Sequence, residues 1–150
     1  MLGKVQGQTV TLYAVWGPNP EKEAYDKIIA LESKYPDGTP WSNNNYYAWK
    51  GGTYSGGYGC AGFAFMLSDA AFGSKKAVKH RNKSNIRVGD IPRLNNDGHS
   101  VIVLEVRENS VIVAEGNIRI NGGTPQVLWG REIPKTDICR YSGDYIMTRW

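Results

Sequence analysis

Two side chains far apart in the sequence, Cys60 and His99, are of the types that nucleophilic acyl transfer uses. Cys60 opens an apolar segment that ends at Phe72, so we expect its thiol at the N-terminus of a buried helix. The unpaired N–H groups and the positive dipole end there lower the pKa of a thiol and favour the thiolate. The same N–H groups can bind the oxyanion that forms in acyl transfer. A structural cysteine sealed in the core is the alternative interpretation.

His99 begins an apolar predicted strand, and the strand that follows contains Glu115 and Asn117. If residues 107–109 form a three-residue hairpin loop, antiparallel pairing places His99 opposite Asn117, with Glu115 one diagonal step away on the same face. A two-residue loop would place His99 opposite Ile118, which offers the imidazole no polar partner. We therefore prefer the first register. A nucleophile, a base and a polar group that orients the base make up a cysteine version of the catalytic triad.

The elements that position these residues are predicted from capping signals and from hydrophobic periodicity. Asn19 can cap a helix that begins at Pro20, and Ala24, Ile28 and Leu31 share its apolar face. After the buried helix over 60–72, strands are predicted over residues 86–94, 99–106, 110–118, 126–133 and 144–149. Two helices followed by a series of strands predict an α+β domain.

A glycine-rich, polar and aromatic segment over residues 39–59 connects the two helices. We expect it to be a long loop, and a loop of this length inside a domain is usually functional. Its tyrosines and tryptophans could line a groove for a peptide or a sugar. The candidate substrate-binding residues in this segment are Trp41, Asn45, Tyr54 and Tyr58.

The composition fits one folded domain and excludes several other classes. At 150 residues, with 41% hydrophobic and 21% charged residues, the chain can bury a core and is not a disordered polymer. It has no apolar run long enough for a membrane span and no N-terminal secretory signal, so a signal for export would lie outside it. The net charge of +4 suits an anionic surface. The basic stretch over 75–87 lacks interleaved aromatic residues, so we expect no nucleic-acid partner.

The two cysteines, Cys60 and Cys139, lack the spacing of a metal site. An oxidising compartment could join them in a disulfide. The sequence around Cys60 favours a free thiol, and we expect neither a metal nor an organic cofactor.

The stretch TVTLYAVW over residues 9–16 is β-branched and aromatic, and the break GPNP over 17–20 follows it. It resembles the closing strand of the InlB-type B-repeat, a β module of Gram-positive surface proteins. The resemblance implies that residues 1–19 are the tail of an upstream repeat plus a linker and that residues 20–150 are a separate domain. It also implies an extracellular location, at the cell surface or in the cell wall. An edge strand of the same domain is the alternative.

Short motifs follow one another within residues 20–150: GCAGF over 59–63, RVGDI over 87–91, GHSVIV over 98–103 and EGN over 115–117. They resemble, in order, the Cys-x-Gly-Phe helix start, the GD and GH strands and the Glu-x-Asn strand end of the CHAP and NlpC/P60 domains, papain-like cysteine hydrolases of bacterial cell walls. The resemblance implies an α+β, papain-like fold with N-terminal helices. In that fold the nucleophile starts a buried helix that packs on an antiparallel sheet.

Two positions depart from the pattern of these domains. Gly59 stands where an acidic residue usually precedes the nucleophile, and Ala61 stands where serine is common. These departures concern the subfamily and the substrate more than the mechanism. The motifs do not identify the side chain that binds the oxyanion in this family. Asn45 and Tyr54 are the candidates for that role.

The resemblance implies that the Cys60 thiolate attacks an amide carbonyl of peptidoglycan, in a stem peptide or at the link between sugar and peptide. His99 then protonates the leaving amine, Glu115 or Asn117 holds the imidazole, and water releases the acyl-enzyme. A catalytically silent wall- or glycan-binding module and an acyl transfer to an amine in place of water are the alternatives.

Overall fold

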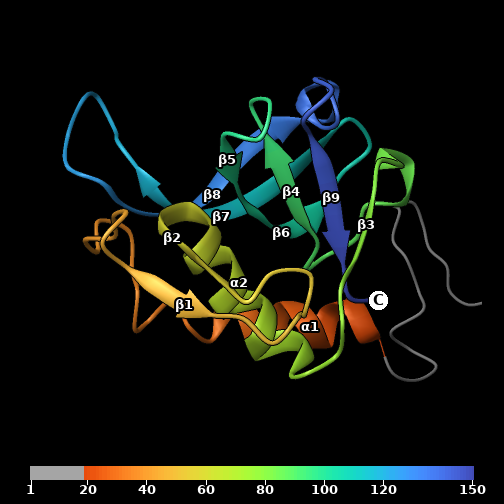
Figure 1. Ribbon diagram of the computed structural model, residues 1–150, viewed down its shortest axis with the longest axis horizontal. Helices are drawn as coiled ribbons and strands as arrows, with labels where there is room; N and C mark the ends of the chain where they lie inside the picture. The colour runs from red at the N-terminus through yellow and green to blue at the C-terminus, as the bar shows by residue number, and fades with distance from the viewer. Residues whose placement is uncertain (1–18) are drawn as a thin grey trace, which may run out of the picture.

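The computed structural model describes residues 19–150. The strand predicted over 9–16, and with it the tail of an upstream repeat, lies outside the described residues. The elements follow in this order (Figure 1): α1 (Pro20–Ile29), β1 (Tyr46–Ala48), β2 (Gly56–Tyr58), α2 (Gly59–Phe72), β3 (Val78–His80), the 3-10 helix η2 (Lys83–Asn85), β4 (Ile91–Leu94), β5 (His99–Ser100), β6 (Ile102–Val106), β7 (Ser110–Ile118), β8 (Gln126–Pro134), the 3-10 helix η3 (Lys135–Asp137) and β9 (Tyr145–Thr148).

The strands of this part of the chain form three separate antiparallel sheets. The sheet orders are β1-β2, β3-β9-β4-β5 and β6-β7-β8. Figure 1 shows α1 and α2 packed together beneath the two larger sheets, with the β1–β2 hairpin to one side of α2. The site residues therefore come from a helix and from two sheets that meet above it.

The predicted papain-like fold is wrong. Among residues 19–150 there are nine strands in three small sheets and only two α-helices, which make a small helix-plus-sheet domain. The matching motifs are three to six residues long, so they carry no information on how the strands group into sheets. The predicted strand over 99–106 shows this, because the chain leaves one sheet at Ser100 and enters another at Ile102.

The change of sheet is hidden in the sequence because this segment is buried on both faces. Val101 and Val103 pack into one core cluster. Ile102 and Leu104 point the opposite way, into the cluster that α1 and α2 complete. A strand between two cores reads as a continuous apolar run. The run therefore predicts a strand without showing where the strand changes partners.

Both helices begin where the sequence predicts. The Asn19 side chain accepts a hydrogen bond from the Lys22 N–H (3.2 Å) and caps α1, whose Ala24 and Ile28 are buried. Helix α2 is apolar on several sides and is the central element of the larger core, with Phe63 fully buried. Neither of the α-helices in residues 19–150 has the length and apolar character that a membrane crossing requires.

The segment predicted as a long loop, residues 39–59, contains the β1–β2 hairpin. Tyr46 pairs with Tyr58, and their rings lie 4.8 Å apart. The hairpin packs closely on α2, since a Cβ on Gly62 would lie 2.6 Å from the carbonyl oxygen of Gly57. Glycine has low strand propensity, which is why the pattern did not predict β2. The hairpin leads into α2 without a loop and so places Cys60 in the first helical turn.

Candidate active site

Cys60 is the second residue of α2, and both backbone polar groups of the preceding residue, Gly59, are hydrogen-bonded. The Gly59 N–H donates to the Asn45 carbonyl (2.9 Å), and the Trp41 indole N–H donates to the Gly59 carbonyl (2.9 Å). Gly59 has a φ of +61°, which lets the chain turn from β2 directly into the helix. The Cys60 thiol is half-buried at this turn, and both it and the Cys139 thiol are free.

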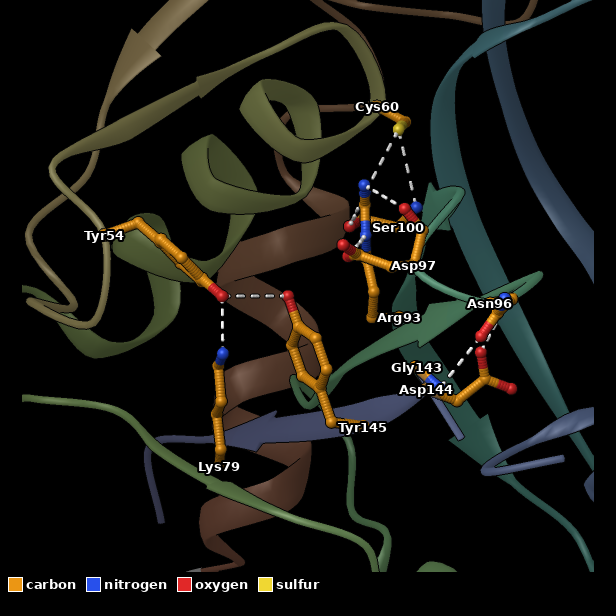
Figure 2. A network of polar contacts seen from close by, with 10 residues as sticks. All are labelled: Tyr54, Cys60, Lys79, Arg93, Asn96, Asp97, Ser100, Gly143, Asp144 and Tyr145. Atoms are coloured by element: carbon orange, nitrogen blue, oxygen red, sulfur yellow. Dashed lines mark hydrogen bonds and ion pairs between the residues drawn. The ribbon is translucent and has the colours of Figure 1, made fainter. Parts of the chain in front are cut away.

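Two donors from the β4–β5 hairpin approach the sulfur of Cys60 (Figure 2). The backbone N–H of Ser100 lies 3.4 Å from Sγ, and Nη1 of Arg93 lies 3.8 Å from it. The Arg93 guanidinium is held by Asp97 (2.8 Å) and by the Ser100 hydroxyl (2.9 Å). The thiol therefore faces one fixed positive charge and one backbone donor, both of which stabilise a thiolate.

His99, in β5, forms an ion pair with a carboxylate that is fully buried. Its Nε2 lies 2.8 Å from Oε1 of Glu115, whose side chain has no exposed surface. Arg131 holds the same carboxylate with two hydrogen bonds of 2.7 Å, from Nε to Oε2 and from Nη2 to Oε1. Because Nε2 is engaged, Nδ1 is the ring nitrogen that remains for the thiol of Cys60.

The hairpin that carries Glu115 differs from the predicted one in its loop. The N–H of Arg107 donates to the carbonyl of Ser110 (2.9 Å), so the loop has two residues. Val106 consequently pairs with Val111 and not with Ser110. The predicted three-residue loop is wrong.

A bulge then restores the predicted register where it matters for the site. The pairing shifts by one residue at Leu104, and beyond it Ile102 pairs with Ala114. This is the register that the three-residue loop would have given, and it turns Glu115 toward His99. Bulges are frequent beside functional sites because they redirect a side chain. The contact between His99 and Glu115 thus depends on one extra residue in β6.

The surroundings of Cys60 favour the thiolate. Burial raises the pKa of the thiol, but the His99 imidazole and the Ser100 N–H act against it and prevail, with a smaller effect from Arg93. The pKa of Cys60 falls as a result from 9.0 to about 7. At neutral pH a large fraction of the thiol is therefore ionised.

The charge of His99 is stabilised in the same way. Burial lowers the pKa of the imidazole, but its interactions with Cys60 and Glu115 raise it by more, to about 9. Burial likewise raises the pKa of Glu115, while the hydrogen bonds from Arg131 and His99 bring it below its ordinary value. Between about pH 7 and pH 9, Cys60 is therefore a thiolate, His99 an imidazolium and Glu115 a carboxylate.

Asn117 belongs to the site but does not orient the base in this structure. It has a φ of +57°, and its amide Nδ2 donates to Oδ1 of Asn43 (3.0 Å). The two amides press against Gly59, where a Cβ would lie 2.4 Å from the Asn43 oxygen and 2.9 Å from the Asn117 nitrogen. This crowding, together with the positive φ, explains why glycine precedes Cys60.

Of the four predicted substrate-binding residues, two contact the backbone of Gly59, and the other two, Tyr54 and Tyr58, do not. Trp41 and Asn45 hold the Gly59 peptide, and Trp41 is only 7% exposed. Tyr54 lines a cavity beside Cys60, and its hydroxyl contacts that of Tyr145 (3.2 Å) (Figure 2). Tyr58 is 62% exposed at the end of the β1–β2 hairpin.

Four site residues were not singled out from the sequence: Asn43, Arg93, Ser100 and Arg131. Arg93 and Ser100 are brought to the thiol by the pairing of β4 with β5, which no local pattern encodes. A signal did exist for Arg131. A carboxylate buried in a strand needs a cationic partner, so Glu115 required a basic residue on a neighbouring strand.

Two cavities flank the Cys60–His99 pair. One, of about 260 Å³, lies beside Cys60 and has Ala61, Arg93 and Ser100 in its lining. The other, of about 570 Å³, is lined by His99 itself. Two further cavities, of about 440 and 720 Å³, are lined by other residues and do not adjoin the pair.

The chemistry that this arrangement can support is that of an activated thiol next to a charged imidazole. Within residues 19–150, no group of three or more His, Cys, Asp or Glu side chains is placed to hold a metal ion. Comparison of the chain with protein-family models, curated proteins and solved structures gave no match. The interpretation of the site therefore depends on its own geometry and on the sequence motifs.

Proposed function

We propose that the protein is a cysteine hydrolase that cleaves an amide bond, with Cys60 as the nucleophile and His99 as its acid and base. One observation carries the proposal: the half-buried thiol at the start of α2 interacts with an imidazole that the buried Glu115 holds at 2.8 Å. A structural cysteine requires none of these neighbours. A thiolate with a pKa near 7 is a strong nucleophile at physiological pH.

The reaction would proceed in two stages. The Cys60 thiolate attacks the amide carbonyl, and the imidazolium of His99 gives its proton to the nitrogen as the C–N bond breaks. A thioester and a free amine result. The now neutral imidazole takes a proton from water, whose oxygen attacks the thioester and releases a carboxylic acid and the Cys60 thiolate. Glu115 is a positioning residue, since it holds the ring and stabilises its charge.

The first turn of α2 supplies donors for the oxyanion. The N–H of Cys60 has no carbonyl partner within the helix because it lies in the first turn. The Asn43 amide is the polar side chain nearest to Gly59, and its Oδ1 is used by Asn117. Nδ2 of Asn43 is thus left to donate, and we assign it together with the Cys60 N–H to the oxyanion.

The proposed substrate is an amide of bacterial peptidoglycan, in the stem peptide or between sugar and peptide. The support is the resemblance of GCAGF, GHSVIV and EGN to the motifs of wall hydrolases, together with the net charge of +4, which favours an anionic polymer. The proposed location, at the cell surface or in the cell wall, follows from this substrate.

The test is digestion of purified peptidoglycan followed by mass analysis of the released fragments. The wild-type protein should release fragments with new amine and carboxylate ends, which also identify the bond, and Cys60→Ala should release none. Equal release by Cys60→Ala would show that the activity does not use this site. An added amine that appears in the products would indicate acyl transfer in place of hydrolysis.

A second candidate, a glycan-binding module without catalysis, is favoured by one observation. Tyr46 and Tyr58 are 50% and 62% exposed, and their rings pack together, tilted by 55°, at the open end of the β1–β2 hairpin. Exposed aromatic faces pack well against sugar rings. Wall binding that survives Cys60→Ala but is lost in Tyr58→Ala, with no fragment release by the wild type, would establish this alternative.

A further inference from the structure

The cavity of about 570 Å³ on the His99 side of Cys60 is lined mainly by side chains that can donate hydrogen bonds. Six of its lining residues are hydrogen-bond donors: Asn43, Asn95, His99, Asn117, Arg119 and Arg131. None of the described residues that line it is a carboxylate. The buried Glu115 lies behind the lining and is already paired with His99 and Arg131.

The charges around this cavity leave a positive excess. Glu115 balances Arg131, and the Cys60 thiolate balances the His99 imidazolium. Among residues 19–150, Arg119 has no such partner: its Nη1 donates to the neutral carbonyl of Gly123 (2.9 Å), which tethers the side chain. The amide groups of the lining add donors without compensating this charge.

The cavity on the Cys60 side differs in both respects, because the Asp97 carboxylate is part of its lining and balances its arginine. Its arginine, Arg93, is paired with Asp97 at 2.8 Å, and Phe65 and Met147 give it an apolar floor. A side chain without charge fits this cavity better than an anion does. The cavity on the His99 side therefore favours an anionic group, and the cavity on the Cys60 side favours an uncharged one.

The position of His99 decides which part of the substrate enters which cavity. The imidazolium must reach the nitrogen of the scissile amide, so the leaving group lies next to His99. The cavity that His99 lines is the one with the uncompensated arginine. We propose that this cavity is the leaving-group subsite and that it selects an amine bearing a carboxylate, such as an amino acid or a peptide end. This inference rests on the proposed hydrolase function for its orientation of the substrate.

Protection of Cys60 from alkylation tests the subsite without requiring turnover. In a Cys139→Ser background, iodoacetamide labels Cys60 while N-acetyl-D-alanine, or its neutral carboxamide, competes for the cavity. We expect the carboxylate to slow labelling and the carboxamide to have little effect. Arg119→Gln should weaken the protection roughly fivefold, as the loss of one exposed charged partner does, and Arg119→Lys should retain most of it. Arg107→Gln, which removes an arginine paired with Glu105, is the matched control.

Equal protection by the carboxylate and the carboxamide, or protection unchanged in Arg119→Gln, would overturn the inference. The outcome is independent of wall digestion. If the carboxylate protects and no peptidoglycan fragment is released, the cavity binds carboxylates, but the hydrolase proposal fails and with it the assignment of the cavity to a leaving group. If fragments are released and Arg119→Gln changes neither protection nor KM, the hydrolase stands and the subsite fails.

Discussion

Nε2 of His99 lies 2.8 Å from Oε1 of Glu115, and the carboxylate that makes this contact is fully buried. The contact engages Nε2, so Nδ1 is the ring nitrogen available for the interaction with Cys60. It also links β5 to β7, which belong to different sheets. The geometry of the proposed base thus depends on the junction between two sheets, and changes at that junction should affect catalysis before they affect the fold.

Glu115→Gln should weaken the base while keeping the shape of the side chain. Without the carboxylate the pKa of His99 falls and that of Cys60 rises, because the imidazolium loses its charged partner. We expect kcat to fall roughly 10²- to 10⁴-fold, as when a triad carboxylate is replaced by its amide. The rate at which peptidoglycan fragments are released at saturating substrate concentration measures kcat. The exposed Glu105→Gln is the control, and equal activity of the two variants would contradict the role of Glu115.

Arg93→Gln should raise the pKa of Cys60, because the guanidinium 3.8 Å from the sulfur stabilises the thiolate. The measurement is the pH dependence of Cys60 alkylation in a Cys139→Ser background, in which we expect the midpoint to move upward. Arg93→Lys should move it less, since the charge is kept. An unchanged midpoint in Arg93→Gln would mean that Arg93 only braces Asp97 and Ser100.

Gly59→Ala should destabilise the protein more than Gly73→Ala. Both glycines have a φ of +61°, so both substitutions strain the backbone, each by about 1 kcal/mol or more. Only at position 59 would the new Cβ meet the amides of Asn43 and Asn117, whereas nothing lies within 4 Å of a Cβ at position 73. We expect an additional loss of about 1–3 kcal/mol at Gly59, measured by urea unfolding. Equal losses would show that the amides move aside freely.

Asn43→Ala should lower kcat with little effect on KM, because an oxyanion donor acts mainly in the transition state. Loss of one such donor typically costs about 10²- to 10³-fold in kcat. The neighbouring exposed residue of the same type supplies the control, Asn44→Ala. A rise in KM at constant kcat would instead place Asn43 among the residues that bind the substrate in its ground state.

The parts of the site that follow from local sequence could be predicted. The Asn19 cap, the buried helix that starts with Cys60, and the strand that carries Glu115 all depend on neighbouring residues, and the structure contains each of them. The partners Arg93 and Arg131 could not be found in this way, because strand pairing at long range brings them to the site.

The grouping of strands into sheets was the main error, and its physical reason lies in one segment. Residues 100–104 are all buried, so their pattern does not reveal that the chain changes sheets at Val101. The bulge at Leu104 is equally invisible, since an apolar residue fits either a regular pair or a bulge. The predicted contact of His99 with Glu115 formed because the unpredicted bulge offset a wrongly predicted loop.

The pH dependence of Cys60 alkylation tests the central claim, an activated thiolate paired with an imidazolium, most directly. In a Cys139→Ser background, labelling by iodoacetamide should rise with a midpoint near pH 7, because the pKa of Cys60 is lowered to about 7. His99→Ala should move the midpoint upward, toward that of an ordinary thiol. A wild-type midpoint near 9, unchanged by His99→Ala, would contradict the account, since Cys60 would then be an unactivated cysteine.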